Sequence, residues 1–270
     1  MQIKRAVPHP VLRKVVRLFE ERRVDLGSTI LSWPAPSGPH QILVVHLAQP
    51  YSKRVNGGPA KSVPETFLVG PQTIPAAQLI LSGHVHVFTI LFQPAGLNRL
   101  IGIDMRSLVN GAPAATDVLG TSAVRLGDAV RAAPDFLARV RAAEQWLDTT
   151  LNKRATSDEA ISVASGLLIA TAGQIRIDDL VRRSGLSARQ FQRRFANQVG
   201  IAPKGYARLI RFDKALVARR NAPERSWNDI LYELGYFDQA HFIREFHMFA
   251  GISPTGFHGD WENIFFPGHD

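Results

Sequence analysis

The sequence predicts an α+β multidomain protein, in which a β-rich barrel with flanking helices precedes an all-α domain. Three observations support this fold class. Residues 28–92 consist of short runs rich in Val, Ile and Phe that are separated by Pro and Gly. From Pro134 onward, apolar residues recur at three- and four-residue spacing, as they do in amphipathic helices. The C-terminal part contains an internal repeat, which indicates a duplicated module.

The composition is that of a folded, basic protein. The chain has 270 residues, of which 45% are hydrophobic, and this is enough for two domains of ordinary size. Lys and Arg number 32 against 23 acidic residues, and the net charge of +9 favours polyanionic partners. The absence of cysteine excludes disulfides, thiolate nucleophiles and Cys-ligated zinc. No apolar run approaches the roughly 18 residues of a membrane span, so we expect a cytoplasmic protein without a membrane partner.

The N-terminal domain is expected to span residues 1–153 and to bind an effector or mediate dimerisation. Its predicted strands are residues 41–48, 65–70, 77–81 and 84–92. Short strands that are spaced by turns are typical of a barrel or a sandwich. Residues 107–127, rich in Gly, Ala and Ser, are expected to form a loop with a short helix.

A helix is then expected to begin at Pro134 and to end near Lys153. Its apolar stripe consists of Phe136, Leu137, Val140, Trp146, Leu147 and Leu151. The stripe either packs on its own barrel or forms a dimer seam. Residues 153–159 are the expected linker to a second domain, residues 154–270.

The internal repeat begins at Asp178 and again at Asn228. The matched positions are Gly185 with Gly235, Phe191 with Phe242, Phe195 with Phe246, and Gly200 with Gly251. The offset between the copies is 50 before the turn and 51 after it, so the second turn holds one additional residue. Two copies are too few for a solenoid, and the pattern therefore indicates a duplicated module.

Each copy has the pattern of a helix, a short turn and a second helix, which is a helix-turn-helix unit. The predicted units span residues 177–199 and 227–250. The expected turn and cap residues are Gly185 with Ser187 in the first copy and Gly235 with Asp238 in the second. Gln190 completes a capping-box pattern with Ser187.

The second helix of each copy has an apolar face and a polar face. The four repeated phenylalanines are expected to face the preceding helix, because they share one side at about 100° per residue. The outward residues are then Arg189, Gln192, Arg193 and Asn197 in the first copy, and Ala240, Arg244 and His247 in the second.

Charge indicates what these outward faces contact. From Arg182 to Arg220 there are eleven Lys or Arg residues and one acid, Asp213, which favours a phosphate partner. The second copy is instead net negative between Glu224 and Phe246. A helix of about 18 residues between the copies is about 27 Å long and can hold two helices in successive major grooves of DNA.

These features resemble the DNA-binding domain of the AraC/XylS family of bacterial transcription regulators. The residues that carry the resemblance are "IDDLVRRSGLSARQFQRRFANQVGIAPKGYARLIRFDKA" and "WNDILYELGYFDQAHFIREFHMFAGISPTGF". The resemblance covers about residues 160–258 and implies seven helices, of which the third and sixth read double-stranded DNA. The candidate DNA-binding residues are Arg189, Gln190, Gln192, Arg193, Asn197, Gln239, Ala240 and Arg244.

The second unit lacks some of the side chains that typically bind DNA bases. Ala240 offers only a methyl contact, and Glu245 is expected to repel phosphate. We therefore expect the second unit to position the protein on DNA more than it specifies bases.

The front half is similar, less specifically, to the barrel that precedes this module in one branch of the family. "ETFLVGPQT" and "FTILFQPAGLNRLIGIDMRSLVN" carry this similarity. It implies effector binding or dimerisation but identifies no ligand. A small-molecule effector, RNA polymerase and a second copy of the chain are the partners that it leaves open, and an effector-free regulator is an alternative.

A cupin-like metal-dependent enzyme or sensor is the alternative from a different class. His84 and His86 lie two apart on a predicted strand, and His46 could join them from another strand. The glutamate expected after such a pair is absent from residues 88–92. We find no catalytic set in the sequence, and we predict a regulator rather than an enzyme, with no cofactor and no metal site.

Overall fold

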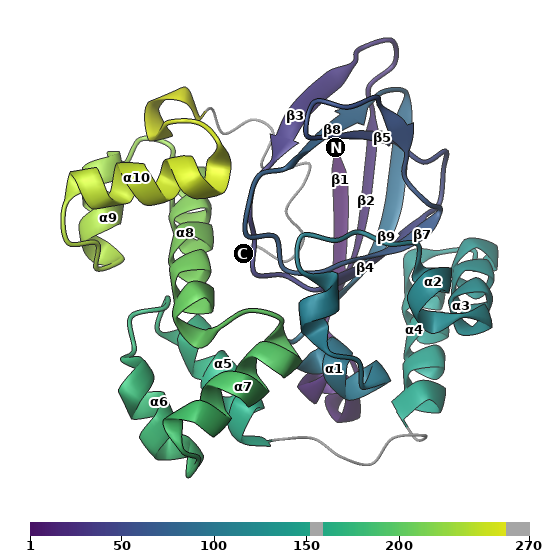
Figure 1. Ribbon diagram of the computed structural model, residues 1–270. Coiled ribbons are helices and arrows are strands. Elements are labelled where there is room, and N and C mark those ends of the chain that lie inside the picture. The colour runs from purple at the N-terminus through teal and green to yellow at the C-terminus, as the bar shows by residue number, and fades with distance from the viewer. Residues whose placement is uncertain (152–158, 258–270) are drawn as a thin grey trace.

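The computed structural model describes residues 1–151 and 159–257 of the chain. A β-rich N-terminal domain and a helical C-terminal domain lie side by side (Figure 1). The predicted fold class is confirmed. The expected domain boundary at residues 153 and 154, with most of the expected linker, lies outside the described residues.

Two antiparallel sheets form the N-terminal domain. The larger sheet has the order β1 (Gln2–Ala6), β2 (Val16–Asp25), β9 (His84–Phe92), β4 (Ile42–His46) and β7 (Thr66–Val69). The smaller sheet has the order β3 (Leu31–Ala35), β8 (Ala77–Leu81), β5 (Ser52–Val55) and β6 (Lys61–Ser62). The four predicted strands correspond to β4, β7, β8 and β9.

Strand β2 was not predicted, because six of its ten residues are charged. Glu20 and Glu21 are nevertheless buried in the larger sheet. Glu20 accepts hydrogen bonds from Arg5, at 2.8 Å, and from Arg22. Glu21 accepts a hydrogen bond of 2.8 Å from Arg139 on helix α4. These ion pairs compensate the carboxylates, so the strand can lie inside the sheet despite its charge.

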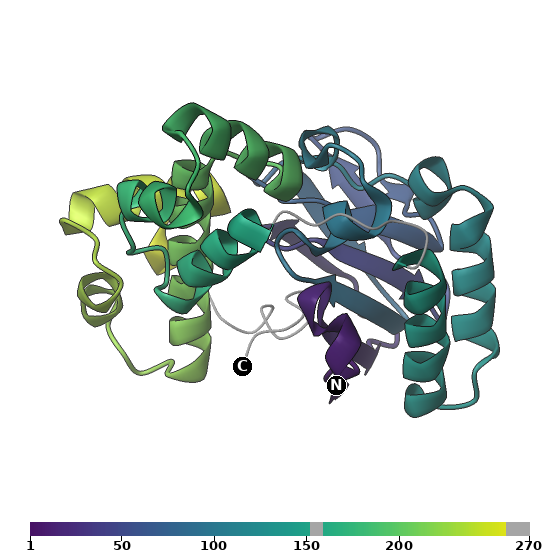
Figure 2. The same ribbon diagram turned by 90° about the horizontal axis from the view of Figure 1, so that it is seen from below.

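Helices cover one face of the larger sheet. They are α1 (Gly96–Ile101), α2 (Ala115–Leu119), α3 (Thr121–Ala132) and α4 (Phe136–Leu151), with short 3-10 turns η1 (Pro10–Lys14) and η2 (Met105–Leu108). Figure 2 shows the sheets between helices α2 to α4 on one side and the C-terminal domain on the other. Residues 107–127 therefore hold more helix than was predicted, because α2 and α3 follow one another across a turn at Gly120.

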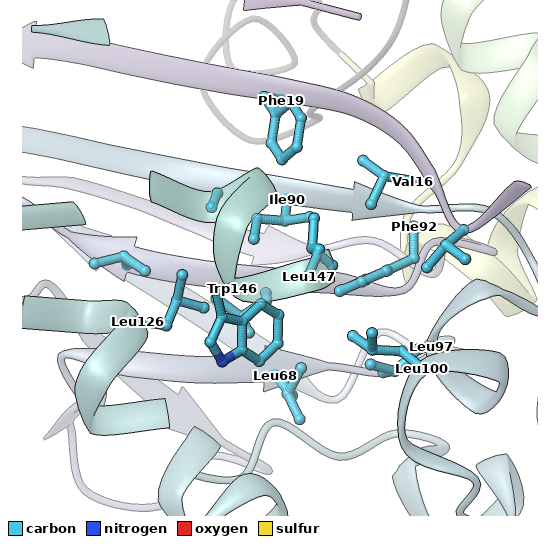
Figure 3. Packing of buried hydrophobic residues seen from close by; sticks show 14 of the residues in the cluster. Val16, Phe19, Leu68, Ile90, Phe92, Leu97, Leu100, Leu126, Trp146 and Leu147 are labelled. Carbon is cyan, nitrogen blue, oxygen red and sulfur yellow. The ribbon is translucent and has the colours of Figure 1, made fainter. Parts of the chain in front are cut away.

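The apolar stripe of α4 packs on its own barrel. Phe136, Val140, Trp146 and Leu147 are buried in one cluster with residues of β2, β7 and β9. Leu137, which was predicted to belong to the stripe, is instead 60% exposed. Figure 3 shows Trp146 and Leu147 among Leu68, Ile90 and Leu126. The indole Nε1 of Trp146 donates a hydrogen bond of 2.8 Å to Ser122. Of the two interpretations of this stripe, the structure supports packing within the domain.

The C-terminal domain consists of helices arranged around one long helix, α8. Its helices are α5 (Glu159–Ala170), α6 (Ile177–Ser184), α7 (Ala188–Val199), α8 (Pro203–Asn221), α9 (Trp227–Glu233) and α10 (Gln239–Ala250), followed by the turn η3 (Pro254–Gly256). None of the helices in the described ranges combines the length and hydropathy needed to cross a bilayer.

Helix α8 belongs to two hydrophobic cores. Tyr206 and Ile210, in its first half, are buried with residues of α5, α6 and α7. Phe212 and Leu216, farther along, are buried with residues of α9 and α10. The two helix-turn-helix units therefore lie at opposite ends of one rigid element (Figure 1).

The turn between α5 and α6 packs directly on α8. Gly173 has a φ of +74°, and a Cβ placed on it would lie 2.2 Å from the carbonyl oxygen of Ala207. A side chain at this position would be strained both by the backbone angle and by the close approach.

We predict that Gly173→Ala lowers the free energy of unfolding by about 1–3 kcal/mol, because it introduces both strains. Gly166→Ala is the matched control, since Gly166 lies in the exposed middle of α5 with open space around its Cβ. That control should raise stability by up to about 1 kcal/mol. Denaturant unfolding of both variants tests the pair, and equal effects would contradict the packing of this turn on α8.

Candidate nucleic-acid interface

The orientation of α7, the second helix of the first unit, is fixed at its start and along its inner face. The Ser187 hydroxyl accepts a hydrogen bond of 3.3 Å from the backbone N–H of Gln190. The Gln190 side chain accepts one of 3.1 Å from the backbone N–H of Ser187, which completes a capping box. Phe191 and Phe195 are fully buried. Arg189, Gln192 and Arg193 are consequently held on the exposed side of the helix.

Two predicted DNA-binding residues of α7 have other contacts. The side-chain oxygen of Gln190 is occupied by the capping box. Asn197 forms a side-chain hydrogen bond with Asp104, at the start of η2 in the N-terminal domain. Hydrogen bonds from Arg106, together with that from Asn197, lower the pKa of Asp104 to about 2. The far end of α7 is thus in contact with the barrel, whereas Arg189 and Arg193 point away from it into solvent.

Helix α10, the second helix of the second unit, is built in the same way. The Asp238 carboxylate accepts a hydrogen bond of 2.6 Å from the backbone N–H of His241 and caps the helix. Phe242 and Phe246 are buried among the rings of Trp227 and Tyr236. The predicted outward residues Gln239, Ala240, Arg244 and His247 are all exposed.

The turn before α10 is one residue longer than its counterpart in the first unit. Tyr236 is buried, and the extra residue, Phe237, has 87% of its surface exposed. Gly235 at this turn has a φ of +70°, close to the +67° of Gly185 in the first turn. The two units therefore share their backbone geometry at the glycine and differ in the residue that follows.

Glu245 is not on the exposed face of α10, and this corrects the interpretation that it is a surface charge that repels phosphate. Its side chain is buried, and it accepts a hydrogen bond from Arg208 on α8. His241 lies 3.4 Å from the same carboxylate oxygen. Because a neighbouring cation compensates the charge, the exposed face of α10 is less acidic than the sequence suggests.

The three histidines of the enzyme alternative do not form one site. His86 lies 3.3 Å from the Glu21 carboxylate, and His84 beside it is exposed. His46 is buried elsewhere, against the rings of Tyr51 and Phe67. Within residues 1–151 and 159–257, no three His, Cys, Asp or Glu side chains gather as metal ligands would.

A cavity of about 230 Å³ lies within the N-terminal domain, between the sheets. Apolar residues dominate its lining, among them Val44, Phe67 and Leu79. Lys53 also lines it, and burial lowers the pKa of this ammonium group. Lys53 was not a predicted site residue, because β5 is too short and too polar to be recognised as a strand from the sequence.

The N-terminal domain contacts both helix-turn-helix units and α8. The backbone N–H of Ser37 donates to the carbonyl oxygen of Phe249, at 2.9 Å, and the Gln41 side chain donates to that of Val199, at 3.1 Å. His40, which also lines the cavity, has its Nε2 3.0 Å from the Asp213 carboxylate of α8. The cavity wall and the connecting helix are thus joined through one side chain.

The buried position of Glu245 can be tested directly. We predict that Glu245→Gln lowers the free energy of unfolding by about 1–3 kcal/mol, because it weakens a buried, charge-assisted hydrogen bond. Glu233→Gln is the control, since its pair with Arg225 is exposed and is worth at most about 1 kcal/mol. Denaturant unfolding of both variants provides the measurement, and equal effects would contradict the burial of Glu245.

A family model matches the C-terminal region, and a curated protein matches part of the chain. The family model described as "Helix-turn-helix domain" matches residues 180–259. The HTH-type transcriptional regulator MtrA of Neisseria gonorrhoeae is 30% identical over 78 residues. This match covers 29% of the chain and only 26% of that protein, so the chain matches about a quarter of the length of this curated relative.

Solved structures are similar over more of the chain at lower identity. ToxT from Vibrio cholerae shares 12% identity with a TM-score of 0.49, over 88% of this chain and 97% of that one. A second structure of ToxT, with an unsaturated fatty acid bound, shares 13% identity with a TM-score of 0.47, over 88% and 94% of the two chains. The AraC-like transcriptional activator CuxR shares 13% identity with a TM-score of 0.29, over 79% and 86%.

The predicted resemblance to the AraC/XylS family rests mainly on the duplicated helix-turn-helix module. Both units, their turns and the connecting helix α8 are present, and the matched family model extends across the second of them completely. The C-terminal region of this chain is therefore an AraC-type helix-turn-helix domain, as found in transcription regulators of the AraC/XylS family.

Proposed function

We propose that the chain is a sequence-specific, DNA-binding transcription regulator that inserts α7 and α10 into successive major grooves. The observation that carries this proposal is the exposed face of α7, on which all charged side chains are positive. Arg189 and Arg193 are exposed and make no ion pair with any described residue, while Phe191 and Phe195 anchor the helix behind them. Two exposed cations on a rigidly held helix suit the phosphates and base edges of DNA.

The exposed side chains of α7 and α10 differ in the contacts that they can make with DNA bases. An Arg can donate two hydrogen bonds to guanine and a Gln can pair with adenine, so Arg189, Gln192 and Arg193 can read bases. On α10, Gln239 and Arg244 have the same capacity, and Ala240 offers a methyl contact. We therefore propose that α7 contributes most of the base specificity. Such a regulator acts where DNA is transcribed, which in a bacterium is the cytoplasm.

The assignment of α7 as the main reading helix can be tested on DNA selected from a random duplex library. We predict that Arg193→Ala weakens binding to the selected site by about 1–3 kcal/mol and relaxes base choice at one position. Arg141→Ala is the control, because Arg141 is exposed on α4 in the N-terminal domain. Indifference of affinity and base choice to replacement of both Arg189 and Arg193 would contradict the assignment.

A small-molecule effector is a second element of the proposal, and the cavity favours it. Lys53 has no carboxylate partner among the described residues, and burial penalises its charged form. A ligand with an apolar body and one anionic group would fill the cavity and also compensate this ammonium. His40 would transmit its presence, because the same side chain contacts Asp213 on α8.

Thermal unfolding with added ligands tests this part of the proposal. We predict that apolar carboxylates raise the melting temperature of the full chain more than the corresponding alcohols do, since only the acid can pair with Lys53. Lys53→Met, which keeps the length of the side chain and removes its charge, should abolish the difference between acid and alcohol. A screen in which no apolar ligand changes the melting temperature would favour the effector-free regulator.

A further inference from the structure

We propose that an open basic cleft between the two helix-turn-helix units binds the phosphate backbone of DNA, apart from the reading residues of α7 and α10. This inference rests on the proposed function and adds a second binding element to it. The cleft has a volume of about 550 Å³. The turn before α6, one face of α8 and the inner side of α10 line it. Its charged and ionisable residues are Arg176, Lys204, Arg208, Arg211, His241 and Glu245.

The charged residues that line the cleft are predominantly positive. Four cations line it, and its one carboxylate, Glu245, is buried and paired with Arg208. Arg211 lies with its guanidinium 5.2 Å from the centre of the Tyr236 ring, so it is partly engaged by the protein. Lys204 is exposed and makes no hydrogen bond or ion pair with any described residue. The cleft therefore presents uncompensated positive charge at its mouth.

Arg176 supplies the second exposed cation. Its Nη2 lies 4.0 Å from the Asp178 carboxylate, and both side chains are more than 80% exposed. Water screens a pair of this kind, so the interaction with Asp178 is weak. A phosphate that enters the cleft can compete with Asp178 for the guanidinium, because phosphate also accepts two parallel hydrogen bonds from Arg.

The cleft opens on the side of α8 that faces away from the barrel. Lys204, Arg208 and Arg211 follow one another at four- and three-residue spacing and share one face of the helix. Asp213, which contacts His40 of the barrel, lies two residues farther and therefore points to the opposite side. The docked N-terminal domain thus leaves the cleft open.

The cleft also borders the reading face of α10. His241 and Glu245 line the cleft, and each directly follows an exposed reading candidate, Ala240 or Arg244. One residue corresponds to a rotation of about 100° around the helix. DNA that receives α10 in its major groove would therefore pass beside the cleft on its way to α7.

The geometry of the DNA favours the backbone as the occupant. Between two successive major grooves on one face, B-DNA presents its minor groove with a phosphate strand on either side. Helix α8, about 28 Å long for its 19 residues, spans this interval. Lys204 and Arg176 would then contact phosphates between the two reading helices and contribute affinity without base specificity.

The test measures how DNA affinity depends on salt, with the full chain and its selected DNA site. Lys204→Ala and Arg176→Ala should each reduce the slope of log affinity against log salt by about 0.9, and the double variant by about twice that amount. The selected base pattern should stay unchanged. Lys204→Arg should retain the slope, and Lys61→Ala, an exposed lysine on β6, is the control that leaves it unaltered.

Ethylation interference locates the contact on the DNA. With the wild-type chain, ethylation of phosphates between the two half-motifs should block binding, and Lys204→Ala should lose this effect. Specific binding with an unchanged salt slope in the double variant, or with no interference between the half-motifs, would overturn the cleft proposal alone. Failure of the wild-type chain to select any DNA sequence would instead overturn the proposed function together with the cleft.

Discussion

The arrangement of the C-terminal domain depends on the burial of α8 in two cores. Its first half is packed with α5, α6 and α7, and its second half with α9 and α10, so neither unit can rotate without exposing apolar surface. Asp213 connects the same helix to His40 in the wall of the barrel cavity. The spacing of the reading helices, the open cleft and the contact with the barrel all follow from the position of this one helix.

Features that repeat or alternate along the chain could be predicted from the sequence. Both units could be identified from the repeated phenylalanines, the turn glycines and the capping residues. Each of these residues is needed locally, to bury one helix face, to reverse the chain or to start a helix. The strands β4 and β9 were equally clear, since both are buried runs of branched and aromatic residues. The exposed residues on α7 followed from the same helical spacing.

Features that depend on pairing between distant residues could not be predicted. Glu20 and Glu21 appear as surface residues in the sequence, but their partners Arg5, Arg22 and Arg139 allow them to lie inside a sheet. Glu245 was misinterpreted for the same reason, because Arg208 lies 37 residues away. Asn197 shares the outward side of α7, and only the docked barrel shows that Asp104 already contacts it. In each case, a partner that is distant in the sequence determines whether the polar side chain is buried and what it contacts.

The longer turn of the second unit shows which parts of a duplicated module are free to change. The added residue did not shift Phe242 or Phe246, both of which remain buried in positions equivalent to those of the first copy. It was accommodated by a bulge, with Phe237 directed into solvent between the buried Tyr236 and the cap residue Asp238. An insertion that moved the core register would expose two aromatic rings, whereas a bulge exposes one. The repeated phenylalanines thus keep the same positions in both copies, and the added residue changes the exposed side of the turn.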